Sequence, residues 1–104
     1  MNELYNSIPE QSVYENISNL IGQVYKLLPY KESNSPFLES HFSNVLLRLS
    51  GLSHIITNFP ELITVISVLE AAKTEENFYV YRKAILDSCS TLKRIQEKYS
   101  VRAV

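Results

Sequence analysis

Apolar residues in the first half of the chain recur with the periodicity of an α-helix. Between residues 9 and 28, successive apolar positions are alternately four and three residues apart: Val13, Ile17, Leu20, Val24 and Leu27. The same alternation begins in the segment 36–58 and spans three heptads: Leu38, Phe42, Val45, Leu49, Leu52, Ile56 and Phe59. This spacing places each set on one face of a helix. The pattern predicts two amphipathic helices, over about residues 9–28 and 36–58.

The segment between these helices has the residues of a short turn. Pro29 removes a backbone donor and interrupts a helix, while Ser33, Asn34 and Ser35 are typical N-cap residues. Pro36 suits the first turn of the next helix. A short connection favours antiparallel packing of the two helices that it joins.

The segment 61–70, ELITVISVLE, is apolar on nearly every side. Its β-branched residues are also typical of a buried strand, but no other stretch of the chain has a strand pattern with which it could pair. A capping Asn58, an early Pro60 and a basic end at Lys73 favour a helix instead. The sequence therefore predicts a short, very apolar helix over residues 60–73.

A fourth helix is predicted over residues 75–99, with Thr74 as its N-cap. Its apolar face consists of Phe78, Tyr81, Ile85, Leu92, Ile95 and Tyr99. Residues 87–91, DSCST, are poor helix formers, so we expect a kink or a break there. The four helices predict an all-α fold: a single domain over residues 1–104, built as a small up-down four-helix bundle with a short tail at 100–104.

The predicted helix lengths leave apolar surface uncovered. The helix 60–73 is the shortest of the four, so the last turns of an antiparallel helix 75–99 should extend past it. We therefore expect Leu92, Ile95 and Tyr99 to lack covering partners within one subunit.

The helix 60–73 also has few polar positions, namely Thr64, Ser67 and Glu70. Two interpretations fit. Either this helix is central and surrounded by the others, or its extra apolar face is an interface with a second copy or another protein. We favour the interface, because a chain of this size has few helices with which to surround another.

The composition is that of a soluble globular chain. The 104 residues are 45% hydrophobic and 20% charged, and a single cysteine, Cys89, excludes an internal disulfide and a thiolate zinc site. No apolar run approaches the roughly 20 residues of a membrane span, and the N-terminus lacks the features of a signal peptide. We expect a cytoplasmic protein with no membrane association.

Residues that carry chemistry are sparse. His41 and His54 lie thirteen residues apart, with no carboxylate or cysteine at ligand spacing. The two glycines, Gly22 and Gly51, fall inside predicted helices, where they favour close helix crossings rather than a phosphate-binding loop. Cys89 has no adjacent base that would activate it. We therefore expect no enzymatic activity, metal, cofactor or small-molecule substrate.

Basic and tyrosine side chains gather toward the C-terminus. Residues 77–104 carry six basic and two acidic side chains, against four basic and nine acidic ones before them. The basic residues either complement the negative end of a helix dipole or meet an acidic partner surface or a phosphate backbone. The tyrosines either fill boundary positions or contribute to an interface. The candidate interaction residues are Tyr79, Tyr81, Arg82, Lys83, Leu92, Lys93, Arg94, Ile95, Lys98 and Tyr99.

These features predict a non-enzymatic helical protein–protein interaction module that acts by stoichiometric binding. Its partner is a second copy of the chain, which gives a dimer, or another protein, or both. The abundant Asn, Ser, Ile, Lys and Tyr residues are typical of an AT-rich coding sequence. We interpret this composition as a sign of a bacterial phage or mobile-element protein. Such a protein would act by inhibiting or modulating a host protein. One alternative is a weak nucleic-acid-binding protein that uses the basic C-terminal helix. The other is a purely structural assembly subunit.

Overall fold

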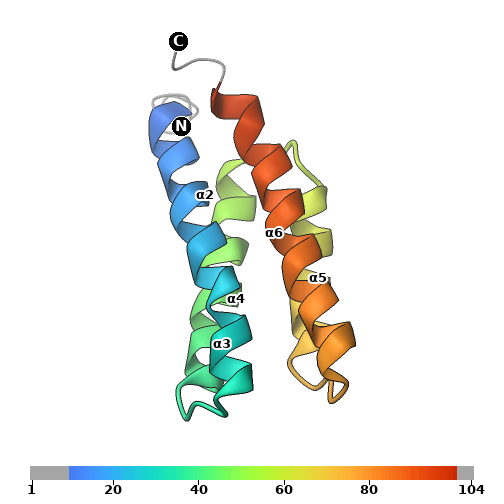
Figure 1. Ribbon diagram of the computed structural model, residues 1–104. Helices are drawn as coiled ribbons and strands as arrows, with labels where there is room; N and C mark the ends of the chain where they lie inside the picture. The colour runs from blue at the N-terminus through green and yellow to red at the C-terminus, as the bar shows by residue number, and fades with distance from the viewer. Residues whose placement is uncertain (1–9, 101–104) are drawn as a thin grey trace.

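Helices account for all the regular secondary structure in residues 10–100, the part of the chain that the computed structural model describes. They are α2 (Glu10–Tyr25), α3 (Leu27–Glu32), α4 (Leu38–Ile55), α5 (Glu61–Ala72) and α6 (Phe78–Ser100). Figure 1 shows α2 and α6 side by side, with α4 and α5 behind them. The predicted small helical bundle is confirmed, while the segments 1–9 and 101–104, with most of the predicted tail, lie outside the described residues.

The first predicted helix continues past its expected end. Pro29 has no N–H with which to bond the carbonyl of Tyr25, so the helix is interrupted at Lys26 and not at the proline itself. Helical bonding resumes at once, because the Tyr30 amide donates to the Lys26 carbonyl over 3.1 Å. The short helix α3 therefore extends the line of α2 to Glu32.

Asn34 is the residue that ends this line of helix. It has a positive φ of 56°, the left-handed conformation that asparagine tolerates better than most residues. The next amide, of Ser35, donates to the Tyr30 carbonyl over 2.9 Å, and the Asn34 amide donates to the Lys31 carbonyl over 3.2 Å. These two bonds form a Schellman motif, which satisfies the last carbonyls of α3. The predicted N-cap function of Asn34 is thus corrected to a C-terminal one.

Helix α6 begins three residues later than predicted. The Asn77 side-chain oxygen accepts hydrogen bonds from the amides of Tyr79 (2.9 Å) and Val80 (3.2 Å), which makes Asn77 the N-cap. Thr74 instead donates its hydroxyl to the Ala71 carbonyl at the end of α5. From Phe78 the helix runs to Ser100 as one element, so the expected break at residues 87–91 is wrong; a kink there stays a prediction.

The antiparallel pair α2 and α6 is the most extensive helix contact in the bundle. Side chains of α6 bond backbone carbonyls along this pair: Tyr81 to Leu27 (2.6 Å), Cys89 to Ile21 (3.8 Å) and Gln96 to Tyr14 (3.2 Å). Residues further along α6 bond to residues earlier in the α2–α3 line, as expected for antiparallel helices. Most heptad positions read from the sequence form the core: Val13, Ile17, Leu20, Val24, Leu27, Phe42, Val45, Leu49, Leu52 and Ile56 are all buried. The two outermost positions of the second set, Leu38 and Phe59, are half-buried against it.

The expectation of uncovered apolar residues near the end of α6 is wrong. Leu92 is 0% exposed and Ile95 2% exposed within one subunit. Helix α2 runs along the same part of α6 and covers it, which the predicted helix lengths did not reveal (Figure 1). Tyr99 is half-buried, and its ring lies 6.0 Å from that of Phe59 in the α4–α5 connection.

Helix α5 is a peripheral helix. It packs against α4 and α6 and buries a single stripe of Leu62, Val65, Leu69 and Ala72. The interpretation of this helix as central is therefore wrong. Its outward face includes Ile63, which is 58% exposed, and the exposed Thr64 and Ser67.

Candidate functional site

Three of the ten candidate interaction residues are core residues. Tyr81 and Leu92 are 0% exposed, so the prediction that they contribute to a binding surface is wrong for this conformation, whereas Ile95 is 2% exposed but lines a hollow described below. They occupy the same stripe of α6 as Ile85, which faces the other helices. The regular spacing of this stripe is the signal of a core face.

Tyr81 holds the first turns of α6 against α3 and α4. Its ring stacks on Phe78 at 6.1 Å between centroids and meets Phe42 edge-on at 6.2 Å, and the Lys31 ammonium lies 5.1 Å from its centroid. Its hydroxyl donates to the Leu27 carbonyl. Burial raises the pKa of Tyr81 to about 12, so the hydroxyl stays protonated and remains a donor at neutral pH. The residue is structural.

The other candidate residues lie at the surface of α6. Tyr79 is 83% exposed, and five cations are exposed along the helix: Arg82, Lys83, Lys93, Arg94 and Lys98. With Asp87 and Glu97 as the acidic residues of this helix, α6 carries a local net charge of +3, whereas the whole chain carries −1.

The cations form two rows. Arg82 and Lys93 are eleven residues apart, as are Lys83 and Arg94. Eleven residues make three helical turns, so each pair shares a face and its members are about 16 Å apart. Lys83 also pairs with Asp87 at 2.7 Å, but both side chains are well exposed, and such a pair adds little stability.

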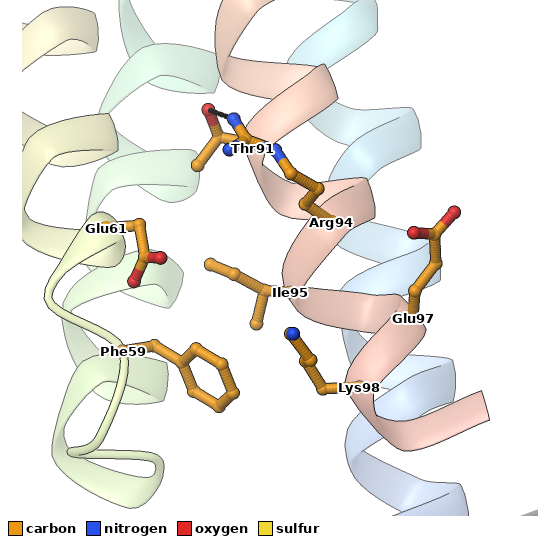
Figure 2. Close-up of a pocket in the computed structure, with 7 residues that line it drawn as sticks. All are labelled: Phe59, Glu61, Thr91, Arg94, Ile95, Glu97 and Lys98. Carbon is orange, nitrogen blue, oxygen red and sulfur yellow. Dashed lines mark hydrogen bonds between the residues drawn. The ribbon is translucent and has the colours of Figure 1, made fainter. Parts of the chain in front are cut away.

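A hollow with a volume of about 620 Å³ lies between the C-terminal half of α6 and the start of α5 (Figure 2). Its lining residues are Phe59, Glu61, Thr91, Arg94, Ile95, Glu97 and Lys98. The core residue Ile95 and the half-buried Phe59 provide apolar surface. The Arg94 guanidinium donates to the Thr91 hydroxyl over 3.4 Å. The hollow therefore combines apolar surface with charged side chains of both signs.

The structure brings Arg94, Ile95 and Lys98 from the candidate set into this hollow and places the buried Tyr81 and Leu92 elsewhere. Sequence reasoning missed Phe59, Glu61, Thr91 and Glu97 as site residues. Phe59 continues the heptad pattern of α4, so periodicity assigned it to the core, and Glu61 matched an ordinary first-turn acid. No local pattern signalled that the α4–α5 connection faces α6.

A smaller hollow of about 250 Å³ lies between α2 and α4. His41 lines it, and its Nε2 atom is 2.7 Å from the Gln23 carbonyl oxygen. Arg48 donates to the Asn19 side chain over 2.8 Å. These polar contacts join the two helices, which gives His41 a structural explanation. The Nδ1 atom of His54 is 2.8 Å from the Ser50 carbonyl oxygen of its own helix.

Cys89 and the two glycines have structural surroundings as well. Cys89 is buried, and burial raises the pKa of its thiol to about 11, so at neutral pH the reactive thiolate is scarce. A Cβ atom added at Gly22 or Gly51 would meet no atom within 4 Å. The expectation that these glycines permit close helix crossings is therefore wrong.

Within the described part of the chain, His, Cys, Asp and Glu side chains do not gather in groups of three that could hold a metal ion. No helix between residues 10 and 100 combines the length and apolar character needed to cross a membrane. No protein-family model matches the chain, and comparisons with curated proteins and with solved structures likewise find no match.

Proposed function

We propose that this protein is a non-enzymatic helical binding module of the cytoplasm that binds a partner protein stoichiometrically through the solvent face of α6 and the adjoining hollow. The observation that carries the proposal is the concentration of exposed cations on one helix beside apolar surface. Arg94 and Lys98 belong both to the cationic face and to the hollow. Such a surface complements an acidic partner that also has an apolar anchor.

A protein partner fits this surface better than a nucleic acid. Asp87 and Glu97 interrupt the cationic face, and Glu61 lies on the opposite side of the hollow. Carboxylates repel phosphates, so they reduce the attraction that the five cations exert on a nucleic-acid backbone. Weak nucleic-acid binding is the second candidate function, because the two rows of cations lie along one helix, α6, where they could contact successive phosphates.

Leu92 and Ile95 are covered within one subunit, so they provide no exposed apolar surface for self-association. We therefore propose that the partner is a different protein and not a second copy of this chain. Inhibition or modulation of a host protein by a phage or mobile-element protein is one biological form that such binding takes.

Affinity capture with a matched pair of charge-reversal variants tests the proposal. The first carries Arg82→Glu and Lys93→Glu on α6, and the control carries Lys26→Glu and Lys73→Glu, which make the same charge change at exposed positions outside α6. We expect a partner that co-purifies at a fixed ratio with the wild type and the control and is lost with the α6 variant. Circular dichroism checks that both variants remain helical.

Equal retention of the partner by the α6 variant and the control would contradict the proposal. Fluorescence anisotropy with labelled DNA and RNA at low salt tests the second candidate. Tight binding to either, lost in the α6 variant, would replace the protein partner with a nucleic acid.

A further inference from the structure

The hollow beside α6 has opposite charges on opposite walls. Figure 2 shows the Lys98 ammonium directed into it from α6 and the Glu61 carboxylate directed into it from the first residue of α5. The Ile95 side chain lies between them, and the Phe59 ring lies below it in this view. The ion pair between described residues joins Lys83 and Asp87 instead, so Glu61 and Lys98 face each other without forming a salt bridge.

The α6 wall is the more cationic of the two. Arg94 lies one turn before Lys98 on the same wall, while the Glu97 carboxylate points away from the centre of the hollow (Figure 2). A ligand that carried only anionic groups would satisfy the α6 wall but would meet Glu61 on the other. A ligand that carried only cations would meet the reverse conflict. The complementary ligand is therefore dipolar, with an apolar group between its two charges.

We propose that the hollow binds an apolar side chain of the partner protein that is flanked by a carboxylate on the α6 side and by an amine or guanidinium on the α5 side. This inference rests on the proposed function, because it names the chemistry of the partner at that same surface. The volume of about 620 Å³ is within the range of sites that enclose a ligand group. An aromatic or branched aliphatic side chain would cover Phe59 and Ile95 and place its neighbours against the two charged walls.

Three capped helical peptides of equal length provide the probe. Each has a central phenylalanine with charged residues four positions before and after it, which puts all three side chains on one helix face. The first carries one glutamate and one lysine at the flanking positions, the second two glutamates and the third two lysines. We expect the mixed peptide to bind roughly two- to fivefold more tightly than either of the others, as for partly exposed ion pairs.

Reversing the charge of the α5 wall predicts a change in which peptide binds best, and a variant that merely failed to fold would not show such a change. In Glu61→Lys both walls are cationic, so the preference should move from the mixed peptide to the peptide with two glutamates. The matched control is Glu70→Lys, which makes the same charge change at an exposed position of α5 that does not line the hollow. This control should keep the preference for the mixed peptide. A residue with a merely structural function would not change which peptide binds best.

Titrations followed by two-dimensional NMR locate the binding. We expect saturable shifts at Phe59, Ile95 and Lys98. Equal affinity for the three peptides, no saturable shift for any of them, or an unchanged preference in Glu61→Lys would overturn the inference. Free phenylalanine that bound as tightly as the mixed peptide would also overturn it, since the hollow would then be a site for a free amino acid.

Failure here is distinguishable from failure of the proposed function. If the partner is lost with the Arg82→Glu and Lys93→Glu variant but no peptide preference exists, the α6 surface binds a partner and the hollow does not select it. If the captured partner is unaffected by charge reversal on α6, the proposed function itself fails.

Discussion

Tyr81 donates its hydroxyl to the backbone carbonyl oxygen of Leu27 over 2.6 Å, which joins the start of α6 to the start of α3. This contact links residues 54 positions apart in the chain. Together with Gln96 and Cys89, it fixes how α6 lies along α2. The exposed faces of α6, and so the candidate binding surface, follow from this arrangement.

Removal of this hydroxyl should destabilise the protein. We expect Tyr81→Phe to lower the free energy of unfolding by about 1 kcal/mol, the usual contribution of one internal hydrogen bond. The control is Tyr79→Phe, whose side chain is 83% exposed and should show no measurable change. Urea denaturation followed by circular dichroism measures both. Equal stability of the two variants would contradict the structural function of Tyr81.

Stability should fall in alkaline solution. Burial raises the pKa of Cys89 from its ordinary 9.0 to about 11 and that of Tyr81 from 10.0 to about 12. The folded protein then retains protons that the unfolded chain has lost, so stability is fully present below about pH 9 and decreases as the pH rises toward 12.

Two variants separate these contributions. Cys89→Ala should remove the part of the decrease between about pH 9 and 11, and Tyr81→Phe the part between about pH 10 and 12. Melting temperatures measured across this pH range provide the test. A wild-type profile that is flat from pH 9 to 12 would show that neither group is buried in its protonated form.

Truncation of Leu92 tests whether the end of α6 is covered within one subunit. We expect Leu92→Ala to lower the free energy of unfolding by about 2–5 kcal/mol, as for a leucine removed from a packed core. Leu47→Ala is the matched control, because Leu47 is 73% exposed and its truncation should change stability by less than about 0.5 kcal/mol. Both values should be independent of protein concentration. A small loss of stability in Leu92→Ala that grew with protein concentration would show that Leu92 is covered by a second subunit and not within one.

The N-cap of α6 gives a fourth prediction. Asn77→Ala should lower the free energy of unfolding by about 1 kcal/mol, because the amides of Tyr79 and Val80 lose their acceptor. Asn77→Asp should retain stability, since a carboxylate accepts the same bonds. Thr74→Ala serves as the control at the position that the sequence favoured. A larger effect at Thr74 than at Asn77 would move the start of the helix back to residue 75.

Periodicity was sufficient to locate the core. The alternating spacing through Val13 to Leu27 and Phe42 to Ile56 marks residues that are all buried, because a helix face is determined locally by the chain. The helix ends were less predictable. Several residues near each end are suitable caps by type, and the choice of Asn77 over Thr74 depends on which amides the side chain actually reaches.

The arrangement of the helices accounts for the remaining errors. A comparison of lengths cannot show which helix lies along which, so it missed that α2 covers Leu92 and Ile95. The hollow depends on the same packing, since Phe59 and Glu61 meet α6 only through the position of the α4–α5 connection. Arg94 and Lys98 on its α6 wall were in the candidate set because of their charge and Ile95 because of its place on the apolar stripe, while its second wall had no sequence signal.

Hydrogen–deuterium exchange of the protein with and without its captured partner tests whether the partner binds through α6 and the hollow. We expect the partner to slow exchange of the backbone amides in residues 91–98 of α6 and in the first turn of α5, on the two sides of the hollow. Protection confined to the outer face of α4, around residues 39–48, or no protection anywhere in residues 10–100, would contradict binding through α6.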